Sequence, residues 1–213
     1  MKLNILAAGC LFTAAVAMPA VAQTTVYTAN LTGPNEDPPN SSPATGTAMI
    51  TINQDAGTMR VEESFSGLTG NVSASHIHCC TTTPHEGLAG IATVSPTFTG
   101  FPSGVMAGDY DHTFNMLDPA SYNSPFLSAN GGTAQGAFDA LIAGINSGSA
   151  YANIHTMPEF TGGEIRGFLA PIPEPETYAM LLAGLAMVSM MARRRLLSCE
   201  DSGVRISLAS AAE

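Results

Sequence analysis

Apolar and polar residues alternate along six short segments of the chain, and alternation with a period of two residues is typical of β-strands. In Thr47–Asn53 the alternation places Met49 on one face and Ile50 and Ile52 on the other. The turn Asp55–Gly57 ends in glycine and predicts a hairpin with the following strand. The six predicted strands are Thr25–Leu31, Thr47–Asn53, Thr58–Leu68, Asn71–His78, Ser149–Thr156 and Gly163–Leu169.

One segment between the strands has helical spacing instead. Within Gly136–Ile145, the apolar residues Phe138, Leu141 and Ile145 recur every three or four positions, which predicts a short helix packed on the sheet. Residues 79–130 are rich in Pro, Thr, Gly and Phe, and their weak periodicity predicts long loops with short strands. Short strands, frequent turns and one helix together indicate an all-β fold, an antiparallel sandwich or barrel.

The N-terminal end has the pattern of an export signal. Residues 1–22 contain one lysine, then an apolar stretch, then the small-residue sequence Ala20–Ala22, so we expect a secretory signal peptide that is cleaved after Ala22. The folded domain is then expected to cover residues 23–170, a usual length for one domain with its own core.

The C-terminal end has the pattern of a membrane anchor. Residues 178–192 are uncharged and apolar on all sides of a helix, and Arg193–Arg195 follow directly. Clustered basic residues mark the cytoplasmic flank of a membrane span, so the segment predicts a transmembrane helix. The precursor is then anchored in the inner membrane with its domain outside, and residues 196–213 form an atypical cytoplasmic tail.

Charge excludes whole classes of function. The chain has 213 residues and a formal net charge of −10, and the only basic side chains of the predicted domain are Arg60 and Arg166. Binding to nucleic acid requires a basic surface that neutralises phosphates, so no nucleic-acid partner is expected. The domain also has no lysine, which excludes Schiff-base chemistry.

Three histidines are candidate metal ligands. His76 and His78 are two residues apart on a predicted strand and therefore share a face, and His155 lies on another strand. Neutral imidazole is a ligand for Zn and Cu. Histidines that are hydrogen-bonded within a β-protein give the same pattern, so both readings stay open.

Two further pairs have candidate structural roles. Cys79 and Cys80 directly follow the histidine strand; they could ligate a metal as thiolates, pack in the core, or form a disulfide between adjacent residues. Glu164 and Arg166 are two apart on one strand face, which predicts an ion pair at the edge of the core.

Several motifs in this order resemble the CHRD domain, the module repeated in chordin and found singly in many exported bacterial proteins. They are LTGPNEDPP (31–39), ATGT (44–47), FSGLT (65–69), ASHIH (74–78), YANIHT (151–156) and GGEIRG (162–167). The resemblance implies a β-sandwich, with the fold of Cu/Zn superoxide dismutase as one candidate. It implies no activity, because fold alone does not fix function.

The C-terminal segment resembles a PEP-CTERM sorting signal. Pro173, Glu174 and Pro175 precede the apolar span, and the arginines Arg193, Arg194 and Arg195 close it. The resemblance implies recognition by an exosortase-like membrane sorting enzyme, which removes the anchor so that the protein continues to the cell surface or the extracellular matrix.

Two functions follow from these observations. The first is a non-enzymatic binding or structural module at the surface or in the matrix, with extracellular polysaccharide or surface proteins as partners. The alternative is a Zn- or Cu-binding β-sandwich, with a redox metalloenzyme as one form, that uses His76, His78 and His155. A dismutase-like centre would need a fourth nitrogen ligand, from His85 or His112.

Overall fold

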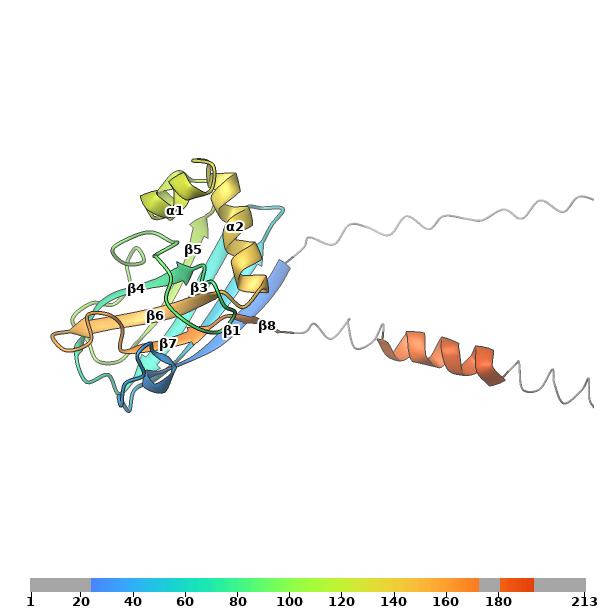
Figure 1. Ribbon diagram of the computed structural model, residues 1–213, viewed down its shortest axis with the longest axis horizontal. Coiled ribbons are helices and arrows are strands. Elements are labelled where there is room, and N and C mark those ends of the chain that lie inside the picture. The colour runs from blue at the N-terminus through green and yellow to red at the C-terminus, as the bar shows by residue number, and fades with distance from the viewer. Residues whose placement is uncertain (1–23, 173–180, 194–213) are drawn as a thin grey trace, which may run out of the picture.

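The computed structural model describes residues 24–172 and 181–193 (Figure 1). The strands are β1 (Thr24–Thr32), β2 (Thr45–Asn53), β3 (Thr58–Ser66), β4 (Asn71–Cys79), β5 (Gly108–Asn115), β6 (Ala150–Met157), β7 (Ile165–Phe168) and β8 (Ala170–Pro171). Within residues 24–172, the helices are the 3-10 turns η1 (Gly33–Asn35) and η2 (Pro119–Ser121) and the α-helices α1 (Ser124–Ala129) and α2 (Ala134–Asn146).

All strands belong to one antiparallel sheet. Its order is β4-β6-β7-β1-β2-β3-β5, and β8 pairs with β1. The sheet curls into an open half-barrel, and α1 and α2 lie together at one end of it (Figure 1). The all-β antiparallel class predicted from the sequence is confirmed, in the form of a single curled sheet with one longer helix.

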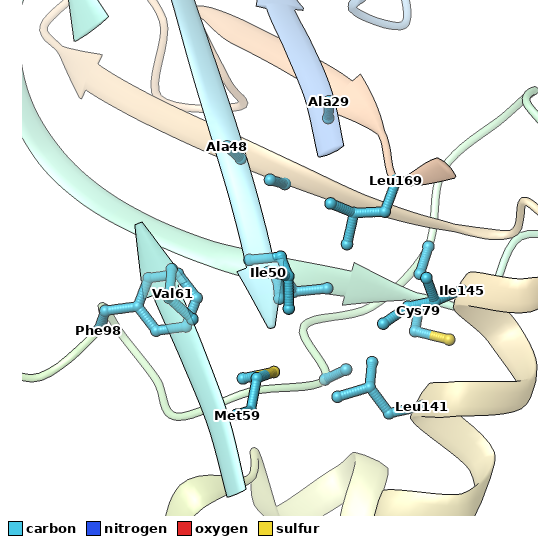
Figure 2. Close-up of a cluster of buried hydrophobic side chains, with 14 of the residues drawn as sticks. Ala29, Ala48, Ile50, Met59, Val61, Cys79, Phe98, Leu141, Ile145 and Leu169 are labelled. Atoms are coloured by element: carbon cyan, nitrogen blue, oxygen red, sulfur yellow. The ribbon is translucent and has the colours of Figure 1, made fainter. Parts of the chain in front are cut away.

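The predicted alternation sets the two faces of the sheet. On β2, Ile50 and Ile52 are fully buried, whereas Met49, on the opposite face of the strand, is 38% exposed. From α2, Leu141 and Ile145 reach the same interior and lie near Met59 and Cys79 (Figure 2). The helix thus covers the open side of the half-barrel with its apolar face. Its first turn is capped by Thr133, whose side chain accepts a hydrogen bond from the Gly136 amide.

The segment of weak periodicity contains two elements that the pattern did not locate. In β5 the inward residues Tyr110 and Phe114 alternate with the polar residues of GDYDHTFN, so the period is present but carried by few apolar positions. The helix α1 is too short to show a helical period. Both elements are defined by packing on the rest of the core.

Some predictions concern residues that lie outside the described ranges. These are the signal peptide over 1–22, the residues Pro173, Glu174 and Pro175, the arginines Arg194 and Arg195, and the tail over 196–213. A helix covers residues 181–193, and its side chains, including Arg193, are exposed almost throughout. Within the described residues, none of the helices has both the length and the apolar character needed to cross a membrane.

Candidate metal centre

The three candidate histidines meet on the outer face of the β4–β6 pair. β4 pairs with β6 in antiparallel register, with Ala74 opposite His155 and His76 opposite Asn153. His155 is therefore the diagonal neighbour of His76, and the Nε2 atoms of these two rings are 2.9 Å apart. With His78, the potential ligand atoms of all three rings lie within 4.8 Å of one another. The structure thus brings the three candidate residues together, with His76 and His78 on the face that the strand period predicted for both.

Backbone carbonyls fix the tautomer of each ring. His76 Nδ1 is 2.9 Å from the Pro96 oxygen, and His78 Nδ1 is 2.8 Å from the Ala89 oxygen. His155 Nδ1 is 3.0 Å from the Thr161 oxygen. Because a carbonyl oxygen can only accept, Nδ1 carries the proton in each neutral ring. The unprotonated Nε2 atoms then turn their lone pairs toward the common centre, as in metal-binding histidines with outer-shell partners.

These Nε2 atoms have no donor among the described residues. In neutral rings protonated at Nδ1, the 2.9 Å contact between His76 and His155 joins two acceptors and is repulsive unless a cation lies between them. His78 Nε2 is buried and has no hydrogen-bond partner in the described part of the chain. Buried polar atoms in proteins are normally satisfied, so these nitrogens, one without a partner and two that face each other as acceptors, make the cluster a candidate site for a cation.

Burial keeps the three rings neutral. It lowers the pKa of His76 to about 3, with further lowering from His155 and His78. Burial likewise lowers the pKa of His78 to about 4, although hydrogen bonding to the Ala89 carbonyl opposes the shift. The pKa of His155 is also lowered by burial. Neutral imidazole is the form that ligates metals, so the cluster is in its ligating state at neutral pH.

An aromatic ring and a cationic side chain pack beside His78. The Tyr151 ring stacks on His78 with 4.8 Å between ring centroids. The Arg166 guanidinium lies over the other side of Tyr151, 4.7 Å from its centroid. Arg166 is anchored by its own donors, from Nη1 to the Gly87 oxygen at 2.9 Å and from Nε to the Asn35 oxygen. The position of His78 is therefore fixed by a rigid stack.

The predicted pairing of Arg166 with Glu164 is wrong. Arg166 instead lies 3.9 Å from Glu36, which belongs to the loop after η1, and both side chains are buried. Glu36 also accepts a 2.7 Å hydrogen bond from Asn153 Nδ2. Burial raises the pKa of Glu36 to about 7, and Arg166 opposes this shift. Arg166 lies on the predicted strand, observed as β7, but Glu164 immediately precedes β7, and a loop distant in sequence supplies the acid that pairs with Arg166.

Glu164 has a different role, as a fully buried link between loops. It accepts hydrogen bonds from Ser42 Oγ, from the amide and hydroxyl of Thr69, from the Gly70 amide and from Thr156 Oγ1. Burial alone would raise the pKa of this carboxyl, but the bonds from Thr156, Thr69 and Ser42 outweigh it and lower the pKa. Glu164 therefore joins three distant segments as a carboxylate.

Cys79 and Cys80 form a disulfide, as one of the sequence alternatives predicted. Cys79 is buried and points into the core toward α2, on the opposite face of β4 from His78 (Figure 2). The two sulfur atoms pack against Gly144 of α2, where an added Cβ would clash with both. The disulfide thus belongs to the helix–sheet contact, and its sulfur atoms are not part of the metal cluster.

The two remaining histidines of the domain lie elsewhere. His85 packs against Phe168, with ring centroids 5.6 Å apart. His112 lies on β5 with its ring 4.6 Å from that of Phe114. Among the described residues, only His76, His78 and His155 form a group of potential metal ligands. The fourth nitrogen of a dismutase-like centre is therefore not supplied by either ring.

Comparison with known families agrees with these motifs. The family model described as the CHRD domain matches residues 27–169, and the one described as the PEP-CTERM protein-sorting motif matches residues 171–195. No curated protein and no solved structure gives a significant match. The sorting motif indicates an exported protein, anchored to the membrane before processing by an exosortase-like enzyme.

Proposed function

Because this chain belongs to the CHRD domain family and carries a PEP-CTERM sorting motif, we propose that it is a surface-associated module that binds one transition-metal ion. His76, His78 and His155 are the ligands, each through Nε2. The observation that carries the proposal is the convergence of three Nε2 atoms whose Nδ1 partners are all backbone carbonyls. The alternative of structural histidines lacks a donor for these atoms within the described residues.

The size of the cluster fits a first-row metal ion. Imidazole nitrogens lie about 2.0–2.1 Å from such an ion, so ligand nitrogens around it are separated by roughly 3–4 Å. The cluster, with ligand atoms within 4.8 Å and its closest pair at 2.9 Å, needs only small ring movements to reach this geometry. Imidazole suits Zn and Cu, the two metals of the alternative function considered from the sequence.

The proposed role is binding rather than catalysis. His76 is 3% exposed and His155 is 8% exposed, and loop residues Ala89, Pro96 and Thr161 contact the rings from outside. Such a centre favours holding an ion over presenting it to a substrate. Anchoring to extracellular polysaccharide or surface proteins is the accompanying prediction, since release of the anchor leaves the domain at the surface or in the matrix.

Calorimetric titration of the purified, metal-free protein tests the proposal. Zn²⁺ or copper should bind near one ion per chain and raise the thermal unfolding midpoint by mass action. His155→Ala removes one of the ligands and should abolish the tight site. His112→Ala is the matched control, because His112 lies outside the cluster, and should leave binding unchanged. No heat and no stabilisation for the unmodified protein, or equal losses in both variants, would refute metal binding.

A further inference from the structure

The ligand set of the histidine cluster is electrically neutral. Each ring is protonated at Nδ1 and donates to a backbone carbonyl, so none of the three ligands brings a negative charge. Within the described residues, no carboxylate or thiolate joins the cluster. The complex of the three ligands with an ion therefore has the same net positive charge as the ion itself.

The surroundings do not supply the missing negative charge. Two charged groups approach the residues around the rings: Arg166 lies over the Tyr151 ring that stacks on His78, and Glu36 accepts a hydrogen bond from Asn153, which is opposite His76 on β6. These two side chains are 3.9 Å apart and offset each other. Since His76 and His155 are almost fully buried, water contributes little screening. The cost of transferring an ion into such a site grows with the square of its charge, so a divalent ion costs about four times as much as a monovalent one.

The number of ligands leads to the same choice of ion. Zn²⁺ takes four ligands, with a water completing the set where the protein supplies three, and divalent copper takes four or more. Here such a water would have to reach an ion beside His76 and His155, which are 3% and 8% exposed. The described residues supply three, and His85 and His112 pack against Phe168 and Phe114 instead. Monovalent copper is stable with three nitrogen ligands and needs no fourth group.

We infer that the centre is selective for a monovalent soft cation and that its physiological ion is Cu⁺. This inference rests on the proposed function and adds the identity and oxidation state of the metal. Cu⁺ enters as Cu⁺, with no electron transfer in the binding step. The buried, neutral and three-coordinate site then holds the ion in its monovalent state, because oxidation to Cu²⁺ would add both a charge and a demand for further ligands.

The test compares four ions on the same metal-free protein. Cu⁺ is added without oxygen in competition with bicinchoninate, and Ag⁺ serves as a probe of equal charge that does not change oxidation state. Zn²⁺ and Cu²⁺ are titrated separately. The expected result is one Cu⁺ per chain, bound at least about 1000-fold more tightly than Zn²⁺, with Ag⁺ competing for the same site. Copper loaded as Cu⁺ should remain silent in electron paramagnetic resonance after exposure to air.

Two variants separate this site from adventitious binding by thiols. Cys10 and Cys199 are present in the full chain, and free thiols bind Cu⁺. His155→Ala should weaken Cu⁺ binding by about 100-fold or more, whereas His112→Ala should not change it. If the unmodified protein binds Zn²⁺ or Cu²⁺ as tightly as Cu⁺, and His155→Ala abolishes this binding, the selectivity for a monovalent ion is wrong. The proposed function, binding of one transition-metal ion, is then still supported. Failure of all four ions to bind in a His155-dependent way overturns both.

Discussion

Glu63 places a carboxyl group inside the half-barrel, and its replacement by glutamine gives a quantitative test of the core. The residue lies on β3 between Val61 and Phe65 and is 2% exposed. Its Oε2 accepts a 2.9 Å hydrogen bond from Ser75 Oγ, while Oε1 is buried without a partner in the described part of the chain. Burial raises the pKa of Glu63 to about 8, and the bond from Ser75 only partly opposes this.

The raised pKa sets both the sign and the size of the effect. An unfolded glutamate ionises near pH 4.3, so between about pH 4.5 and pH 8 the folded state keeps a proton that the unfolded state has lost. Stability therefore falls as pH rises through this window, by about 1.4 kcal/mol per pH unit. From pH 5 to pH 8 the loss from Glu63 is about 4 kcal/mol. Glutamine is neutral throughout and has no such loss.

Urea unfolding of Glu63→Gln and the unmodified protein at pH 5, 6, 7 and 8 measures the difference directly, in chelator so that no metal contributes. The free energy of unfolding of the variant should rise relative to that of the unmodified protein by about 4 kcal/mol across the series. Glu62→Gln is the matched control, since Glu62 is the next residue on β3 and pairs with Arg60 on the outer face. A difference for Glu63→Gln that stays constant with pH would show that the folded protein already holds an ionised Glu63.

Three other predictions follow from the described contacts. Arg166→Met should destabilise the protein by about 3–5 kcal/mol, because it leaves Glu36 buried beside no cation, whereas Arg60→Met, in an exposed ion pair, should leave the melting midpoint nearly unchanged. Glu164→Gln should lower the free energy of unfolding by about 3 kcal/mol at pH 7, because the bonds to the carboxylate are weakened. The difference should shrink as pH falls below the ordinary glutamate range and through the lowered pKa of Glu164, where the carboxylate is protonated; unchanged urea midpoints would contradict it. Mass spectrometry of protein from the native host should find no mature species with residues 178–213; an intact C terminus in the extracellular fraction would refute processing.

The sequence predicted well those features that depend on neighbours along one strand. The period of two separated the buried residues Ile50 and Ile52 from the exposed Met49 and put His76 and His78 on a common face. The pairing of this face with His155 was carried by family resemblance, because strand pairing over long separations leaves no local pattern.

The features that the sequence did not predict depend on loops that fold back from far away. The partner of Arg166 is Glu36, brought in by the turn η1, and the donors to Glu164 come from Ser42 and Thr69. A polar residue in a loop gives no sign of which buried group it will meet. Glu63 alternates with Val61 and Phe65 along β3, in agreement with its burial. Nothing in the sequence indicated that Ser75 would bond only Oε2 of this carboxyl and that Oε1 would have no partner among the described residues.

The position of β1 has a consequence for how the protein is made. One edge of β1 pairs with β2, which follows it in sequence after residues 33–44. The other edge of β1 pairs with β7 and with β8, where Tyr27 is opposite Pro171, far along the chain. Loop closure over such a separation is entropically costly, so the hairpin β1–β2 can form long before the sheet is complete. A chain that is exported from its N terminus in an unfolded state would expose this edge of β1, which could pair with another copy, until β7 and β8 follow. β7 lies just before the sorting motif, which starts at residue 171, and β8 overlaps the first residue of the motif, so the segment that completes the pairing of β1 adjoins the segment that directs sorting.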